Sequence, residues 1–126
     1  MEDDATPTAE PWQVMGENLE IMTGGIPWGR RMSFRVTKLE KGRVWGIQPW
    51  KERLVGDPDT GVIHGGVLTS FLDNLSGMAA SSALDKARFV STLDLRIDYM
   101  RAAEPHREIL GEAECYHITR SVCFTR

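Results

Sequence analysis

The chain has few of the residues on which secreted, metal-binding and membrane proteins depend. It contains two cysteines, Cys115 and Cys123, in 126 residues, too few for a disulfide scaffold and without the spacing of a zinc site. No run of about 18 apolar residues occurs, and the acidic N-terminus lacks the basic and apolar parts of a signal peptide. We therefore expect reduced thiols, no metal centre, no membrane span and a cytoplasmic location.

An excess of positive charge is also missing. Fifteen basic and eighteen acidic residues give a formal net charge of -3, which provides no general attraction for nucleic acid or an anionic membrane. The length and the 41% hydrophobic content fit one domain. We predict a disordered lead-in over residues 1–10, which have no periodic pattern, and a single domain over residues 11–126.

Periodic patterns then predict the elements of this domain. Apolar residues at helical spacing predict a short helix after Pro11 that ends at Gly24-Gly25, and a long helix over residues 66–84. Alternating residues predict a hairpin and three later strands. The predicted strands cover residues 32–36, 43–47, 89–101, 109–119 and 122–125, and a surface loop covers residues 55–61.

Strands that follow one another without crossover helices favour an antiparallel sheet. The remaining face of the long helix is small or polar apart from Asp73, so the helix can be covered nearly all round. The predicted fold is therefore α+β, with an antiparallel sheet wrapped around one long central helix. Because the sequence stops inside a strand pattern, we expect the domain to lack its last strand.

The most informative residues stand at the start of the long helix. His64-Gly65-Gly66 follows a loop, and the first N–H groups of a helix have no internal partner, so they can hold a carbonyl oxygen. Asp73 lies in an otherwise apolar and small-residue helix, where a carboxylate is costly unless it has a partner. The alternative for Gly65-Gly66 is that the two glycines only let the loop enter a tightly packed helix. The alternative for Asp73 is an exposed helix residue or a core carboxylate with hydrogen-bond partners.

Distance along the helix separates these two features. The eight residues from Gly65 to Asp73 span about 12 Å of helix axis, too far for one reacting carbonyl carbon to contact both. Two such helices packed antiparallel about a two-fold axis would bring Asp73 of one chain near Gly65 of the other. A catalytic role therefore predicts a homodimer.

His64-Gly65-Gly66 with Asp73, followed by the stretch from Ser91 to Ala102, resembles the hotdog-fold acyl-CoA thioesterases of the phenylacetic-acid-degradation (PaaI-type) group. The resemblance covers roughly residues 20–126. It implies hydrolysis of acyl-CoA esters without a cofactor, since CoA is part of the substrate. It also implies dimers that are joined edge to edge and often paired into tetramers.

The resemblance also assigns roles to individual residues. Asp73 would be the nucleophile or the general base, Gly65 N–H would polarise the carbonyl, and His64 would orient the loop or the carbonyl. Thr92 matches a position where relatives place a hydroxyl, although it is also an ordinary strand residue. The substrate-binding candidates are Gly66, Arg101, and Asp57 and Asp59 in a loop where many relatives have asparagine.

Two other functions fit parts of the pattern. A hotdog hydratase or dehydratase acting on enoyl-CoA would use Asp59 and His64, which are five positions apart, and would not need Asp73. A non-catalytic protein of the same fold would bind acyl-CoA and retain Asp73 for packing. Asp73 separates the thioesterase from the hydratase, whereas CoA release from thioesters separates the thioesterase from the binding protein.

Overall fold

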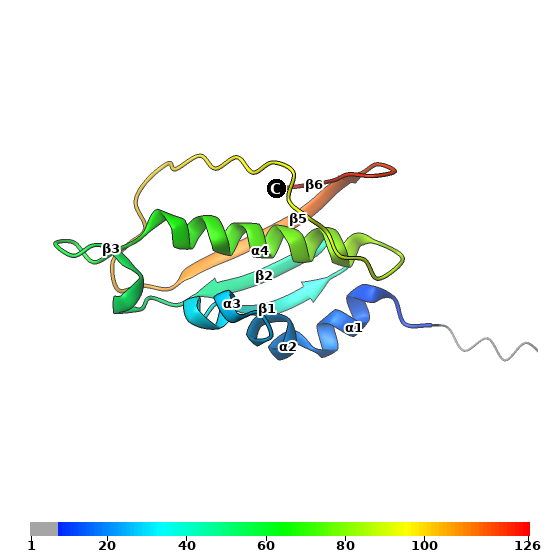
Figure 1. Ribbon diagram of the computed structural model, residues 1–126, viewed down its shortest axis with the longest axis horizontal. Helices are drawn as coiled ribbons and strands as arrows, with labels where there is room; N and C mark the ends of the chain where they lie inside the picture. The colour runs from blue at the N-terminus through cyan, green and yellow to red at the C-terminus, as the bar shows by residue number, and fades with distance from the viewer. Residues whose placement is uncertain (1–7) are drawn as a thin grey trace, which may run out of the picture.

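A computed structural model describes residues 8–126 as a sheet curved around one long helix (Figure 1). The four-stranded antiparallel sheet has the order β1-β2-β5-β6, and the helix α4 crosses it. Its strands are β1 (Arg35–Glu40), β2 (Arg43–Gln48), β5 (Ile109–Ile118) and β6 (Cys123–Thr125), and α4 spans Gly65–Ala83. The predicted architecture and the predicted long helix are confirmed.

Two facing glycines allow α4 to lie close to the sheet. Gly46 of β2 pairs with Gly111 of β5. A Cβ at Gly111 would come within 2.6 Å of Leu75 Cδ1 and 2.7 Å of Phe71 Cε1, and a Cβ at Gly46 within 2.9 Å of Leu75 Cδ2. Leu75 and Phe71 therefore pack directly on the sheet backbone, and the core forms around them.

Leu75→Ala should strongly destabilise this packing. The Leu75 side chain is fully buried between α4 and the sheet, and the glycines below it have no side chains that can fill the space. We expect the free energy of unfolding to fall by about 2–5 kcal/mol, measured by urea denaturation. The matched control is Leu110→Ala, which truncates a 73% exposed leucine beside Gly111. Equal stabilities for the two variants would contradict this account of the core.

The N-terminal region differs from the prediction of a single helix. Three short helices, α1 (Pro11–Glu17), α2 (Leu19–Gly24) and α3 (Pro27–Met32), cover the end of the domain beside β1. The chain leaves the helical conformation at Asn18, where φ is -125°. Proline at the first position begins α3, a start signal that the prediction overlooked. Met32 consequently ends a helix, and β1 begins at Arg35 instead of residue 32.

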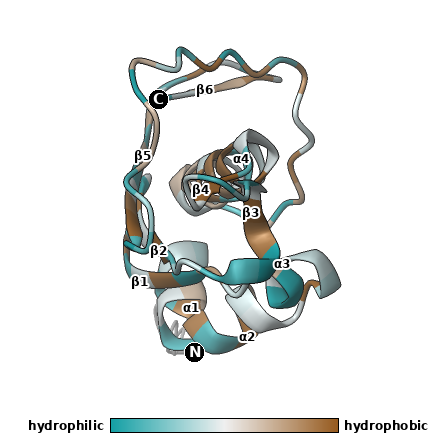
Figure 2. Ribbon diagram, turned by 90° about the vertical axis from the view of Figure 1, so that its left-hand side faces the viewer, coloured by the Kyte–Doolittle hydropathy of each residue, from teal (hydrophilic) through white to brown (hydrophobic). Residues whose placement is uncertain are grey.

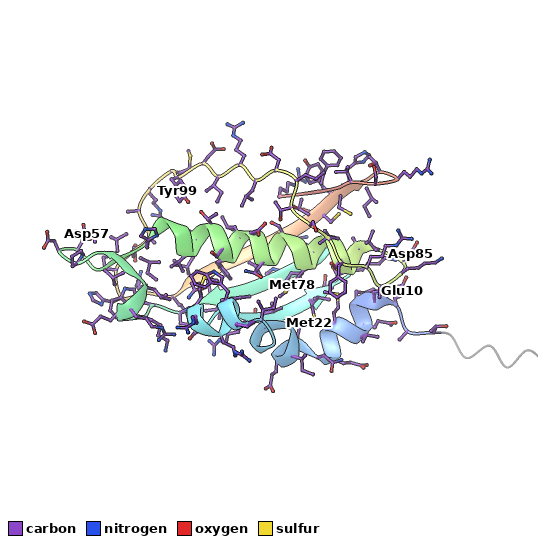
Figure 3. All side chains as sticks on the ribbon, viewed as in Figure 1. Glu10, Met22, Asp57, Met78, Asp85 and Tyr99 are labelled. Carbon is purple, nitrogen blue, oxygen red and sulfur yellow. The ribbon has the colours of Figure 1, made fainter. Side chains whose placement is uncertain are left out.

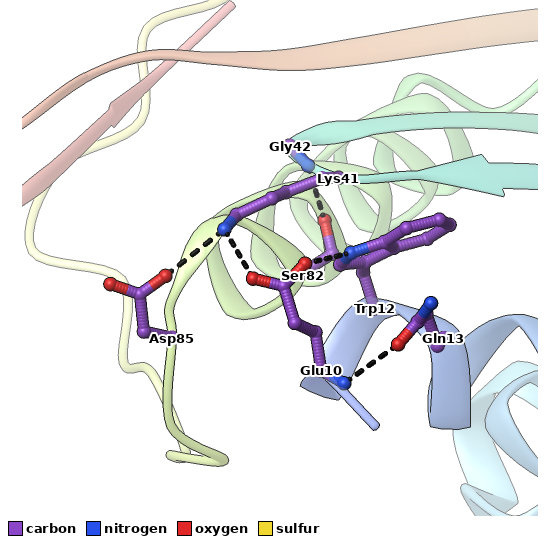
Figure 4. A network of polar contacts seen from close by, with 7 residues as sticks. All are labelled: Glu10, Trp12, Gln13, Lys41, Gly42, Ser82 and Asp85. Carbon is purple, nitrogen blue, oxygen red and sulfur yellow. Dashed lines mark hydrogen bonds and ion pairs between the residues drawn. The ribbon is translucent and has the colours of Figure 1, made fainter. Parts of the chain in front are cut away.

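A cluster of polar side chains ties α1 to the β1–β2 turn and to the end of α4 (Figure 4). Lys41 Nζ lies 2.8 Å from Glu10 Oε1 and 3.0 Å from Asp85 Oδ1. Trp12 Nε1 donates to the second Glu10 oxygen at 2.6 Å. The predicted disordered lead-in over residues 1–10 is therefore too long, because Glu10 belongs to a defined structure. Residues 1–7 of that prediction lie outside the described part of the chain.

The ion pair gives a pH-dependent contribution to stability. The Lys41 hydrogen bond, followed by that from Trp12, lowers the pKa of Glu10. Because the pKa is lower in the folded state, the stabilisation is present above the unfolded-state pKa and is lost as the pH falls through the folded-state pKa. Glu10→Gln should therefore cause a small decrease in Tm at neutral pH and none in strong acid, measured by circular dichroism.

Glu17→Gln is the control for this prediction, because Glu17 belongs to the same helix and forms no ion pair among residues 8–126. It should show no comparable pH-dependent loss. A decrease in Tm for Glu10→Gln that is the same at neutral and acidic pH would show that the ion pair is not its source.

The prediction of a strand over residues 89–101 is wrong in one respect. The segment is extended and lies alongside α4, but it forms no strand ladder within the described chain (Figures 1 and 2). The side of the segment that alternation makes apolar is not buried, since Leu93 is 81% exposed and Tyr99 57%. Extended conformation is a local property, whereas strand pairing requires a neighbouring edge.

The predicted loop over residues 55–61 is the tip of a small antiparallel hairpin. A 3-10 turn at Glu52–Leu54 leads into β3 (Val55–Asp57), which pairs with β4 (Val62–Ile63) immediately before α4. Gly61 has a φ of 79°, which a residue with a side chain rarely adopts. Of the helices in residues 8–126, none is both long and apolar enough to cross a bilayer.

Candidate active site

The β3–β4 hairpin delivers His64 to the start of α4. His64 N–H donates to the Leu54 carbonyl at 2.9 Å. Gly56 lies so close that a Cβ on it would be 2.8 Å from His64 Cα. The Asp57 carboxylate is occupied within the hairpin, because it accepts from Asp59 N–H and from the Thr60 hydroxyl. Asp57 therefore builds the turn that carries His64, and Figure 3 places it far out on the loop.

His64 caps α4 with its side chain. Nδ1 accepts the Gly66 N–H at 2.9 Å, so a neutral His64 ring carries its proton on Nε2. The Gly66 N–H is already used in this bond, so it is not free to bind a substrate oxygen as the sequence-based prediction would require. A Cβ on Gly66 would lie 2.9 Å from Nδ1, so glycine is required at this position for the cap. Gly65 N–H is the helix-start donor without a partner among residues 8–126.

Asp73 and Thr92 are in direct contact. Thr92 Oγ1 donates to Asp73 Oδ1 at 2.6 Å. Asp73 is half-buried on the face of α4 that points away from the sheet core, and Thr92 comes from the extended segment. The hydroxyl fixes the rotation of the carboxylate and leaves its other oxygen for a water molecule or a substrate. The two residues selected separately from the sequence thus belong to one local site.

A groove of about 630 Å³ opens beside this pair. Its walls are the middle of α4, the start of the extended segment and the β5–β6 end of the sheet. Asp73 and Thr92 line it, together with the basic residues Arg88 and Arg120. A carboxylate and two guanidinium groups in one groove can accommodate a reacting ester and an anionic substrate part.

The extended segment runs antiparallel to α4 and covers one stripe of it. Gly65, Thr69, Asp73 and Gly77 recur every four residues and therefore share this stripe. Val90 lies against Gly77, Thr92 against Asp73, and Tyr99 against Thr69 and Gly65. Residues 92 and 99 would face opposite ways in a regular strand, but the chain bends at Leu93. The small residues of α4 make room for this segment.

Other predicted site residues are not brought to this pair. Gly65 and Asp73 lie eight positions apart on one continuous helix, about 12 Å along its axis. Asp59 is exposed in the hairpin turn and forms no hydrogen bond or ion pair with His64 in the described part of the chain. Arg101 is exposed and does not line the groove, where Arg88 and Arg120 stand instead.

Burial disfavours one of the two thiols as a nucleophile. Cys115 and Cys123 are both free, and burial together with the neighbouring Cys123 raises the pKa of the Cys115 thiol, which lowers its reactive thiolate fraction. Over residues 8–126 no group of three or more His, Cys, Asp or Glu side chains is arranged to hold a metal ion.

The curved antiparallel sheet around a central helix is the hotdog fold. Among solved structures, a Pseudomonas aeruginosa protein is 32% identical, with a TM-score of 0.76 over 88% of this chain and 82% of that one. The PaaI protein of the Escherichia coli phenylacetic acid degradation operon has a TM-score of 0.73 over 91% and 89% at 12% identity, a likeness of fold alone.

Sequence comparison identifies the family. The Thioesterase superfamily profile matches residues 60–126, more than half of the chain, so this chain belongs to the thioesterase superfamily. A Halobacterium salinarum protein whose name proposes an esterase is 40% identical over 77 residues, which are 59% of this chain. The match spans 50% of that relative's own length.

Proposed function

We propose that this protein hydrolyses acyl-CoA thioesters to a carboxylic acid and CoA, with Asp73 as the nucleophile or general base. The observation that carries the proposal is the Thr92-oriented carboxylate of Asp73 in a groove, in a chain of the thioesterase superfamily. Water adds its oxygen to the acyl carbon, the carbon–sulfur bond breaks, and the CoA thiolate takes up a proton. The proton released by the attacking water is taken by Asp73 when it acts as a base.

The second group of the site is the Gly65 N–H. Its lack of a partner in the described chain and its position at a helix start suit it to hold the thioester oxygen as negative charge develops. Nε2 of a neutral His64 ring carries a second donor proton, which the cap leaves free. Both donors stand at the solvent-exposed start of α4, where a substrate can approach them.

The working unit in this proposal is a homodimer, and two such dimers would pair through a second interface. The Gly65 N–H and the Asp73 carboxylate are too far apart along one helix to act on one carbon. A second copy, with its α4 antiparallel, supplies the missing partner in each of two equal sites. The exposed backbone of the extended segment offers such a copy an edge for strand pairing.

The test is release of CoA thiol from short-chain, medium-chain and arylacyl-CoA esters by the purified chain, with hydration of an enoyl-CoA followed in parallel. The expected result is thiol release from at least one ester and no hydration. Hydration without thiol release would favour the Asp59–His64 chemistry. Thermal stabilisation by acyl-CoA without either reaction would favour a binding protein.

A further inference from the structure

The peptide unit that joins Gly65 to Gly66 is fixed at both of its polar atoms. Its N–H donates to His64 Nδ1 at 2.9 Å. Its carbonyl oxygen lies 3.2 Å from the Tyr99 hydroxyl and 3.2 Å from the Thr69 hydroxyl. These two hydroxyl oxygens are themselves 2.9 Å apart. Tyr99 is on the extended segment above the start of α4 (Figure 3), so the contact joins two distant parts of the sequence.

Two hydroxyl protons must serve the three contacts among Tyr99, Thr69 and the Gly65 carbonyl. The Gly65 carbonyl can accept from Tyr99, from Thr69 or from both, and a hydroxyl that does not donate to it can donate to the other hydroxyl. The Gly65 oxygen thus receives at least one hydroxyl proton in every arrangement. When one hydroxyl is removed, the other can still donate to this carbonyl, but it has lost the hydroxyl partner that orients it.

Consecutive glycines make this restraint consequential. Glycine has no Cβ, so the backbone of Gly65-Gly66 has more accessible conformations than any other dipeptide at this place. A donor that stabilises developing charge acts well only when its direction is fixed before the reaction. Fixing the Gly65–Gly66 peptide restricts the torsions of Gly65 and hence the direction of its own N–H.

We infer that Tyr99, together with Thr69, is a positioning residue that holds the Gly65 N–H in the direction required to bind the thioester oxygen. The inference rests on the proposed function. It also gives the extended segment a defined role, because Thr92 near its start orients Asp73 and Tyr99 near its end orients the helix start. In the proposed dimer, one segment thus prepares one half of each of the two centres.

The test compares Tyr99→Phe with the matched control Tyr116→Phe, which removes the hydroxyl of the other tyrosine, on β5. Tyr116 Oη makes no hydrogen bond within residues 8–126. Tyr99→Phe should lower kcat by about three- to tenfold, with KM and the pH profile of the reaction unchanged. Tyr116→Phe should leave kcat as in wild type.

The double variant Tyr99→Phe/Thr69→Val gives a second, more specific result. Because either hydroxyl can serve the Gly65 carbonyl alone, the double variant should lose more activity than the product of the two single losses. Hydrogen exchange measured by ¹⁵N NMR gives an independent readout. The Gly66 amide hydrogen should exchange with solvent faster in Tyr99→Phe than in wild type, and at the wild-type rate in Tyr116→Phe.

The outcomes separate this inference from the proposed function. A wild type that hydrolyses no thioester overturns both. An active wild type, with kcat of Tyr99→Phe within twofold of it or a change confined to KM, overturns the positioning role alone. Loss of kcat with unchanged exchange at Gly66 also overturns it, because the effect would then not pass through this peptide.

Discussion

Asp73→Asn is expected to lower kcat/KM for thioester hydrolysis by about 100-fold or more. Asparagine has nearly the same shape as aspartate, and its amide oxygen can still accept the Thr92 hydroxyl, so the contact at 2.6 Å is retained. It can neither remove a proton from water nor attack the acyl carbon as a carboxylate. The loss should therefore appear in kcat, while the fold and the groove persist.

The measurement is CoA thiol release by wild type and Asp73→Asn, with circular dichroism and molecular mass compared for both. Asp94→Asn is a matched control, because Asp94 is an exposed carboxylate that lines the same groove without a hydrogen-bond partner in the described chain. It changes the charge of the groove by the same amount as Asp73→Asn. Similar losses in the two variants would assign the effect to charge, and full activity in Asp73→Asn would exclude Asp73 from the chemistry.

The element that carries Asp73 was predictable from sequence because its signals are local. The expected helix, residues 66–84, differs from the observed Gly65–Ala83 by one residue at each end. An uninterrupted 3.6-residue pattern and a glycine-rich entry determine it. The N-terminal helices show the limit of such patterns: the spacing of Trp12, Met15, Leu19 and Met22 continues across Asn18, where the backbone itself turns.

The extended segment shows what a strand pattern does not contain. Alternation over residues 89–101 predicts an extended backbone, and the backbone is extended. Alternation does not specify a neighbouring strand edge, because that edge depends on distant parts of the chain. This segment pairs with no other strand of the described residues. The apolar side of this pattern is not buried either, because the bend at Leu93 changes which side chains point toward α4.

The candidate site was predictable in part. Asp73, His64 and Gly65 stood out because glycines at a helix start and a carboxylate in an apolar helix each need an explanation. Thr92 was selected, but its contact with Asp73 depends on the path of the segment. The contact of Tyr99 with the Gly65 carbonyl was missed, since it joins residues 34 positions apart and its only sequence signal is a hydroxyl on a strand-like residue.

Gly65→Pro should reduce kcat by about 100- to 1000-fold, the usual cost of losing one donor to a developing oxyanion. Proline removes the N–H from the first residue of α4, a position at which proline is favoured and no helical hydrogen bond is lost. His64 already has φ -58° and ψ 135°, the conformation that a residue before proline adopts. The variant therefore deletes the donor with little disturbance of the helix.

Gly65→Ala is the control, because it keeps the N–H and its Cβ would approach Tyr99 Oη only to an ordinary contact of 3.7 Å. The comparison uses thiol release and Tm for wild type and both variants. Gly65→Ala should retain most of the wild-type kcat, and all three proteins should have similar Tm values. A Gly65→Pro variant that is folded and fully active would exclude this N–H from the reaction.

Gly65→Pro, combined with Asp73→Asn, also tests whether Asp73 and the Gly65 N–H of one site come from different chains. In a heterodimer of one Asp73→Asn chain and one Gly65→Pro chain, a shared site leaves one centre with both wild-type groups and another with neither. Purified through two different tags, this heterodimer should have about half the wild-type activity, although each parental homodimer is nearly inactive. A site contained within one chain would leave no intact centre, so a heterodimer as inactive as its parents would exclude the shared arrangement.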